Sequence, residues 1–84
     1  MERRTVIITG AGIGIGAATA RAFAVADYRV VVTDVLEDDG QAVADEIRAA
    51  GGEAEFRHLD VTSTDEVDGV VAAVEKAHGP LEAL

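Results

Sequence analysis

The stretch that decides the fold is TGAGIGIG, which occupies residues 9–16. Four of its last seven residues are glycine, and a short β-branched run, Thr5–Thr9, leads into it. Such a run ended by glycine is typical of a buried strand. The apolar positions that follow recur at helical spacing, at Ile15, Ala18, Ala22 and Val25. This spacing predicts a helix from Ile15, with its two alanines close against the sheet.

The next segments repeat the alternation of strand and helix. Residues 28–33, a mainly apolar run closed by Asp34, predict the second strand. Residues 53–59, a more polar run, predict a third strand that suits a sheet edge. Between them we expect a helix from about Glu37, ended by glycines at 51 and 52. Its expected apolar face contains Val43, Ile47 and Ala50.

The third helix has the clearest boundaries. Ser63 and Glu66 stand in the S-x-x-E relation of a capping box, and Gly79-Pro80 ends the segment. Its apolar stripe contains Val67, Val70, Val71 and Val74. An apolar segment, Leu81–Leu84, then begins a fourth strand.

Strands that alternate with helices predict an α/β fold with a doubly wound parallel sheet, in the order β-α-β-α-β-α plus the start of a fourth strand. In the strand order 3-2-1-4 the first strand is central and needs the fourth beside it. Because the sequence stops at residue 84, soon after the fourth strand begins, we expect the first strand to have an open, hydrophobic edge. This open edge indicates an incomplete domain, with residues 1–84 as its N-terminal part.

Composition excludes several classes of partner. The chain has 84 residues, 49% hydrophobic and 27% charged, and its formal net charge is −9. Nucleic acid and anionic membrane surfaces are disfavoured, because both require clustered basic residues. There is no cysteine, which excludes disulfides and thiolate metal sites. No apolar run approaches the ~20 residues of a membrane span, and none resembles a signal peptide. We expect a cytoplasmic protein.

The glycine-rich turn lies between a strand and a helix, the context in which it predicts dinucleotide binding. Two registers fit: Gly12, Gly14 and Ala17 satisfy G-x-G-x-x-A, whereas Gly10, Gly14 and Gly16 satisfy T-G-x-x-x-G-x-G. We prefer the second register, because it places the first glycine directly after the strand. The alternative is a glycine-rich turn without a ligand.

Two aspartates follow strands that would end at the same edge of the sheet. Asp34 ends the second strand, 18 residues after Gly16. A carboxylate there can accept hydrogen bonds from an adenosine ribose and repels a 2′-phosphate, which favours NAD over NADP. Asp60-Val61 follows the third strand. The alternative for both aspartates is a structural turn before a helix.

Together these pieces resemble the short-chain dehydrogenase/reductase family, through Thr9-Gly10-x-x-x-Gly14-Ile15-Gly16, Asp34, Asp60-Val61-Thr62 and Gly79-Pro80-Leu81. The spacing matches the single-domain oxidoreductases better than the extended sugar-nucleotide enzymes. The resemblance implies a Rossmann-type fold in which Gly10–Gly16 hold the pyrophosphate. It further implies that the Ile15 backbone lies near the nicotinamide-side ribose, that Asp34 selects NAD, and that Asp60 reaches the adenine amino group. The implied cofactor-binding set is Gly10, Gly12, Ile13, Gly14, Ile15, Gly16, Asp34, Asp60 and the Val61 backbone.

The sequence departs from the family pattern at two positions. Ile13 stands where the family often has a small, polar or basic residue, and Asp27 stands where many members have glycine. The catalytic Ser and Tyr-x-x-x-Lys of the family are not found in these 84 residues. Tyr28 and Lys76 are interpreted as a packing tyrosine and a surface lysine. Neither His58 nor His78 belongs to a metal-ligand pattern.

Three functional hypotheses follow. The first is the NAD-binding part of an oxidoreductase that moves hydride between the nicotinamide and an alcohol/carbonyl pair, with a homo-oligomer possible for the full-length parent. The second is a non-catalytic nucleotide-binding module completed by a partner or a homodimer. The third is a non-functional remnant. We prefer the first, and for the 84 residues themselves we expect dinucleotide binding without turnover.

Overall fold

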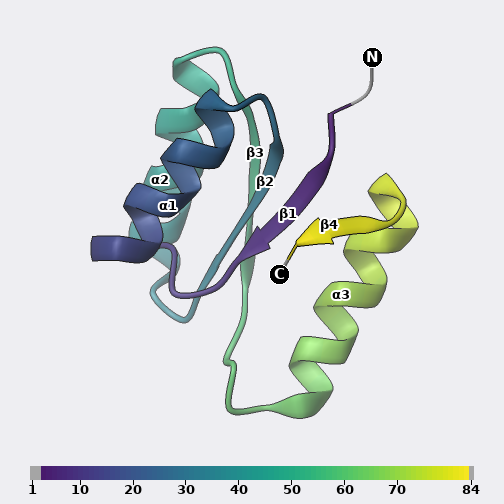
Figure 1. The fold of residues 1–84 in the computed structure, drawn as a ribbon. Helices are drawn as coiled ribbons and strands as arrows, with labels where there is room; N and C mark the ends of the chain where they lie inside the picture. The colour runs from purple at the N-terminus through teal and green to yellow at the C-terminus, as the bar shows by residue number, and fades with distance from the viewer. Residues whose placement is uncertain (1–2, 84) are drawn as a thin grey trace.

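The computed structural model describes residues 3–83, with the side chains of residues 3–81. Its elements are β1 (Thr5–Ile8), α1 (Gly14–Val25), β2 (Arg29–Asp34), α2 (Glu37–Ala49), β3 (Glu53–His58), α3 (Thr64–His78) and β4 (Leu81–Ala83) (Figure 1). The predicted alternation of strands and helices is confirmed. Leu84, the last residue of the expected fourth strand, lies outside the described residues.

The sheet has the strand order β3-β2-β1-β4, and every pairing is parallel. This is the doubly wound order that the sequence predicts. β3 lies at one edge, as its polar composition indicates. Its full length pairs with β2, from Arg29 opposite Glu53 to Asp34 opposite His58.

The open edge that we expected on β1 is present only in part. β4 pairs with the first half of β1, with Leu81 opposite Thr5 and Ala83 opposite Val6. The register shifts between these two pairs, so three residues of β4 lie opposite two residues of β1. In the described residues this pairing does not reach Ile7 and Ile8.

The helices lie on both faces of the sheet, α1 and α2 on one and α3 on the other (Figure 1). Successive side chains of a strand point to opposite faces, so each strand serves two cores. Val6, Val30 and Val32 pack with α1 and α2 in the larger core. Ile7 and Val31 pack with Val74 of α3 in the smaller core. The predicted apolar stripe of α3 is confirmed, because its other three valines are partly buried.

The predicted buried face of α1 is wrong. Ile15 and Val25 are 87% and 88% exposed, and both Ala18 and Ala22 are exposed as well. The helix instead buries Ala17 and Ala20 against the sheet. Because α1 carries apolar residues on nearly every side, hydrophobic spacing does not select one face. On α2 the stripe of Val43 and Ile47 is confirmed, whereas Ala50 caps the helix and is exposed.

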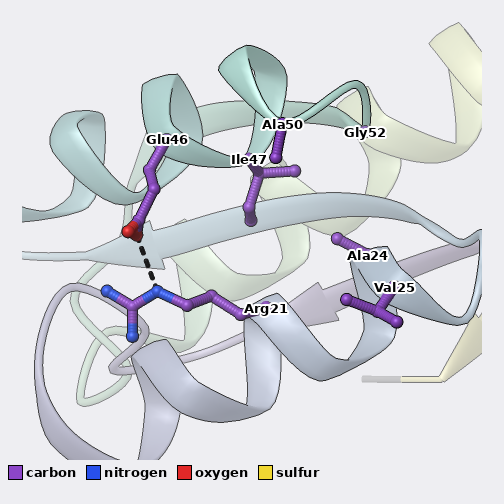
Figure 2. Close-up of a pocket in the computed structure, with 7 residues that line it drawn as sticks. All are labelled: Arg21, Ala24, Val25, Glu46, Ile47, Ala50 and Gly52. Carbon is purple, nitrogen blue, oxygen red and sulfur yellow. Dashed lines mark hydrogen bonds and ion pairs between the residues drawn. The ribbon is translucent and has the colours of Figure 1, made fainter.

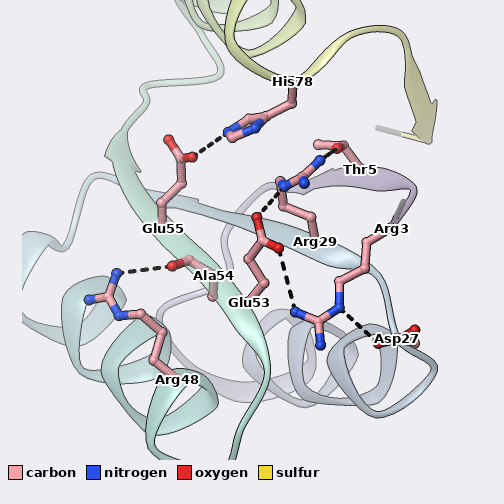
Figure 3. Close-up of polar contacts among 9 residues, drawn as sticks. All are labelled: Arg3, Thr5, Asp27, Arg29, Arg48, Glu53, Ala54, Glu55 and His78. Atoms are coloured by element: carbon pink, nitrogen blue, oxygen red, sulfur yellow. Dashed lines mark hydrogen bonds and ion pairs between the residues drawn. The ribbon is translucent and has the colours of Figure 1, made fainter. Parts of the chain in front are cut away.

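Ion pairs join the amino ends of the strands, at the end of the sheet opposite the glycine turn. Figure 3 shows these contacts. Arg29 pairs with Glu53 on the neighbouring strand and donates to Thr5 Oγ1 over 2.9 Å. Arg3 Nη1 lies 3.4 Å from Glu53 Oε1, and Arg3 Nε lies 2.8 Å from Asp27 Oδ1. Asp27 has a φ of +71°, a left-handed conformation that favours glycine.

Candidate functional site at the carboxyl ends of the strands

The residues that the sequence singles out gather at the carboxyl ends of the strands. Gly10 follows β1, Asp34 is the last residue of β2, and Asp60 follows β3. Backbone hydrogen bonds tie these strand ends together. Ala11 N–H donates to Thr33 O over 2.9 Å, and Leu59 N–H donates to Asp34 O over 3.1 Å. The three strand ends therefore form one continuous rim.

The glycine turn requires glycine most strictly at three positions. Gly10 and Gly14 have φ values of +59° and +58°, in the left-handed region that favours glycine. At Gly16 a Cβ atom would lie 2.1 Å from Gly10 O, which forbids any side chain. These are the glycines of the preferred T-G-x-x-x-G-x-G register. Gly12 is less restricted, because its Cβ would lie 3.0 Å from Asp34 Oδ2.

The helix that follows the turn begins without a side-chain cap. Ile13 occupies the N-cap in an extended conformation and makes no capping bond, and the first turn of α1 has no acidic residue. The other two helices carry carboxylates in their first turns. Backbone N–H groups and the positive end of the helix dipole are thus available at α1. An anion such as a pyrophosphate fits this end of the helix.

Asp34 is buried and ionised. Its side chain accepts from Gly12 N–H at Oδ2 over 2.9 Å and from Leu36 N–H at Oδ1 over 3.1 Å. Burial by itself raises the pKa of Asp34, but hydrogen bonds from the backbone of Leu36, Gly12 and Val35 outweigh it and lower the pKa below its ordinary value. A carboxylate has about four acceptor positions, so Asp34 retains capacity for ligand hydroxyls.

The charge around Asp34 is negative. The first turn of α2 carries Glu37, Asp38 and Asp39, all exposed. These carboxylates, with Val35 and Leu36, line a cavity of about 460 Å³. A second cavity of about 350 Å³ beside Gly12 is also lined by Arg21, whose guanidinium pairs with Glu46 over 2.7 Å.

Asp60 is held in a tight turn. Its Oδ1 accepts from Thr62 N–H over 2.9 Å and from Thr62 Oγ1 over 2.6 Å, and these bonds lower the pKa of Asp60. Val61 is 59% exposed beside it.

The capping box is formed only in part. Glu66 N–H donates to Ser63 Oγ, as predicted, over 3.3 Å. The Glu66 carboxylate, however, accepts from Asp60 N–H over 3.2 Å instead of from Ser63. The reason is that Ser63 N–H already donates to Asp60 O. The link between Glu66 and Asp60 is a feature that the sequence pattern alone misses.

Two further cavities lie near α1. One of about 410 Å³ adjoins the glycine turn and is lined by residues of β1 and α1, among them Gly10, Ile15 and Thr19. The other, of about 290 Å³, lies between α1 and α2 at their C-terminal halves (Figure 2). Its walls include Val25 and Ile47, and it is near the amino ends of the strands, away from the glycine turn.

Tyr28, Lys76 and His78 lie away from these strand ends, whereas His58 is the last residue of β3 and stands beside the site. Tyr28 packs edge-on against Phe23 with ring centroids 5.1 Å apart, and Lys76 is exposed on α3. Both interpretations are confirmed. His58 Nδ1 lies 3.4 Å from Glu66 Oε1, and His78 Nε2 lies 2.8 Å from Glu55 Oε1. Within residues 3–83 no cluster of three or more His, Cys, Asp or Glu could hold a metal. No described helix is long and apolar enough to cross a membrane.

Comparison with known proteins gives consistent matches. A family model for short-chain dehydrogenases matches residues 4–84. An uncharacterized oxidoreductase of Bacillus subtilis is 39% identical over 84 residues, which are 100% of this chain and 31% of that protein. A 2,5-dichloro-2,5-cyclohexadiene-1,4-diol dehydrogenase of Sphingobium indicum is 42% identical over 81 residues, 96% of this chain and 32% of that protein. The chain thus spans about a third of the length of these relatives.

Solved structures match the fold closely. A hydroxysteroid dehydrogenase from Escherichia coli has a TM-score of 0.92 at 38% identity, over 96% of this chain and 34% of that chain. A metagenomic short-chain oxidoreductase in complex with NADP also has a TM-score of 0.92, at 40% identity, over 96% of this chain and 37% of that chain.

Proposed function

Since this chain belongs to the short-chain dehydrogenase family, whose members use a dinucleotide cofactor, we propose that it forms the NAD-binding part of an oxidoreductase. In this proposal residues 1–84 are the N-terminal part of a single Rossmann domain. The bound dinucleotide supplies hydride transfer at its nicotinamide ring. We assign the oxidation or reduction of an alcohol/carbonyl pair to a whole protein of the length of the relatives. We propose that this whole protein is cytoplasmic and homo-oligomeric.

The glycine turn and α1 fit the phosphate part of the cofactor. A Cβ at Gly16 would clash with the backbone of Gly10, so the turn closes tightly over the first turn of α1. Uncapped N–H groups there can donate to a pyrophosphate, and residues 10–16 contain no Lys or Arg. We assign this role to the segment Gly10–Gly16, with Gly12, Ile13 and Gly14 in its centre and the Ile15 backbone toward the nicotinamide-side ribose.

The two aspartates fit the adenosine part. Asp34 would accept hydrogen bonds from the ribose hydroxyls, Asp60 would accept from the adenine amino group, and the Val61 backbone would lie beside the ring. The rim of strand ends on which they stand is where ligands bind in doubly wound sheets.

The buried, ionised carboxylate of Asp34 carries the preference for NAD over NADP. Its pKa is lowered, so it stays charged across the physiological pH range and repels a 2′-phosphate. Glu37, Asp38 and Asp39 add negative charge on the same side. One related structure contains NADP, so the preference is a property to be tested on this chain.

Titration of the chain with NAD and with NADP tests the proposal. We expect NAD to bind more tightly, and Asp34→Ala to reduce or reverse the difference. Asp38→Ala is the matched control, because it removes one nearby exposed charge without touching the strand end. If Asp34→Ala left both affinities unchanged, the assignment of Asp34 would be wrong. If neither nucleotide bound the folded chain, the cofactor site itself would be refuted.

A further inference from the structure

The N-cap and the first turn of α3 hold both backbone polar groups of Asp60. Asp60 N–H donates to Glu66 Oε1 over 3.2 Å, and Asp60 O accepts from Ser63 N–H over 3.0 Å. Residue 60 is therefore fixed to the helix, although it follows β3. The orientation of its side chain depends on this attachment.

The side chain of Asp60 has one oxygen to offer. Both bonds from Thr62 fall on Oδ1, so Oδ2 is the oxygen that can accept from a ligand. Since the backbone is held by Glu66 and one carboxylate oxygen by Thr62, the direction of Oδ2 is set by both contacts.

Glu66 is positioned for this contact by its surroundings. Its Oε1 lies 3.4 Å from His58 Nδ1, and its own N–H is bonded to Ser63 Oγ. The Glu66 side chain is 43% exposed, which is ordinary for a surface carboxylate. A carboxylate in a first helical turn is stabilised by the helix dipole wherever it points. The bond to Asp60 is what distinguishes Glu66 from Asp65 in the same turn.

We infer that Glu66 is a positioning residue for adenine recognition, which acts through the Asp60 backbone to direct the Asp60 carboxylate at the adenine amino group. The inference rests on the proposed function, because it assumes that Asp60 contacts adenine. It predicts that the length of the side chain at position 66 matters more than its charge.

The test compares NAD with its hypoxanthine analogue, in which a carbonyl oxygen replaces the adenine amino group. The wild-type chain should bind NAD about two- to tenfold more tightly, the range of one net hydrogen bond. Glu66→Asp keeps the charge but is one methylene shorter, so it should lose most of this preference. Glu66→Gln keeps both the reach and an acceptor oxygen, so it should retain the preference. Asp65→Asn is the control for charge in this turn and should also retain it.

The affinity ratio separates the two proposals. Partial unfolding weakens both dinucleotides by the same factor, so the ratio reports the folded site alone. The inference would be overturned if Glu66→Asp kept the preference for NAD, or if Glu66→Gln lost as much of it as Glu66→Asp. Either result would leave the proposed cofactor site intact. A wild-type chain without the preference would overturn the adenine contact of Asp60 and, with it, the role of Glu66.

Discussion

Asp34 Oδ2 accepts a hydrogen bond from Gly12 N–H over 2.9 Å, and this bond joins the end of β2 to the middle of the glycine turn. The carboxylate that we propose to contact the ribose therefore also shapes the loop proposed to hold the pyrophosphate. Because the proposed ribose contact and the bond to the turn involve the same carboxylate, substitutions of Asp34 must be measured for stability as well as for binding.

The first prediction is that Asp34→Asn destabilises the chain by about 1–3 kcal/mol. The carboxylate accepts two backbone N–H groups, one at each oxygen, whereas an amide offers only one oxygen. One of these two N–H groups then faces an NH₂ group. Urea unfolding at pH 7 measures the free energy of unfolding of both chains.

Asp38→Asn is the control for that measurement. Asp38 is exposed in the first turn of α2, where its charge contributes about 0.3–1 kcal/mol through the helix dipole. Equal losses in the two variants would mean that the bonds of Asp34 to the turn do not contribute to stability.

The second prediction concerns two glycines with opposite surroundings. Gly16→Ala should prevent the turn from closing, because the added Cβ would lie 2.1 Å from Gly10 O and backbone must move. Gly69→Ala, within α3, meets nothing within 4 Å and should stabilise the chain by about 0.5–1 kcal/mol through helix propensity. Thermal unfolding compares both with wild type. A Gly16→Ala chain as stable as wild type would contradict the described geometry of the turn.

The third prediction is a loss of stability in acid. The pKa of Glu53 is lowered chiefly by the hydrogen bond from Arg29, and the pKa values of Asp34 and Asp60 are lowered as well. A carboxyl with a lowered folded-state pKa stabilises the fold above its ordinary pKa, and this contribution is lost as the pH falls through the folded value. The ordinary values are 4.5 for Glu53 and 3.8 for the aspartates. Urea unfolding should thus show constant stability near neutral pH and a progressive loss below pH 4.5.

Glu53→Gln isolates one part of that acid effect. The variant lacks the carboxylate that pairs with Arg29 and Arg3 at the amino ends of the strands (Figure 3). Its stability should fall less than that of wild type as the pH is lowered through this range. If the two chains lost the same amount of stability over this pH range, the ion pairs of Glu53 would not contribute to the loss of stability in acid.

Much of the architecture was predictable because its signals are local. The β-branched run before Gly10 indicates a strand, and the glycines at 51 and 79 follow helix ends with a positive φ. The strand order is that of doubly wound dinucleotide-binding sheets, which the glycine-rich turn after the first strand indicates. The partner of Glu66 was not predictable, because Ser63 N–H donates to Asp60 O, a contact that depends on how the chain leaves β3. The pairing of β4 also depends on tertiary packing, because three residues do not form a strand by propensity alone.

The buried face of α1 is the clearest failure, and it leads to the last prediction. Spacing favours the exposed stripe through Ala22, whereas the structure packs Ala20 against the sheet with no exposed surface. Ala20→Leu should therefore cost about 1–3 kcal/mol by overpacking, and Ala22→Leu should change stability by about 0.5 kcal/mol or less. Urea unfolding of the two variants decides between the faces, since both make the same chemical change on one helix. The reverse order of the two losses would mean that α1 is rotated about its axis relative to the structure, and that Ala22 lies inside.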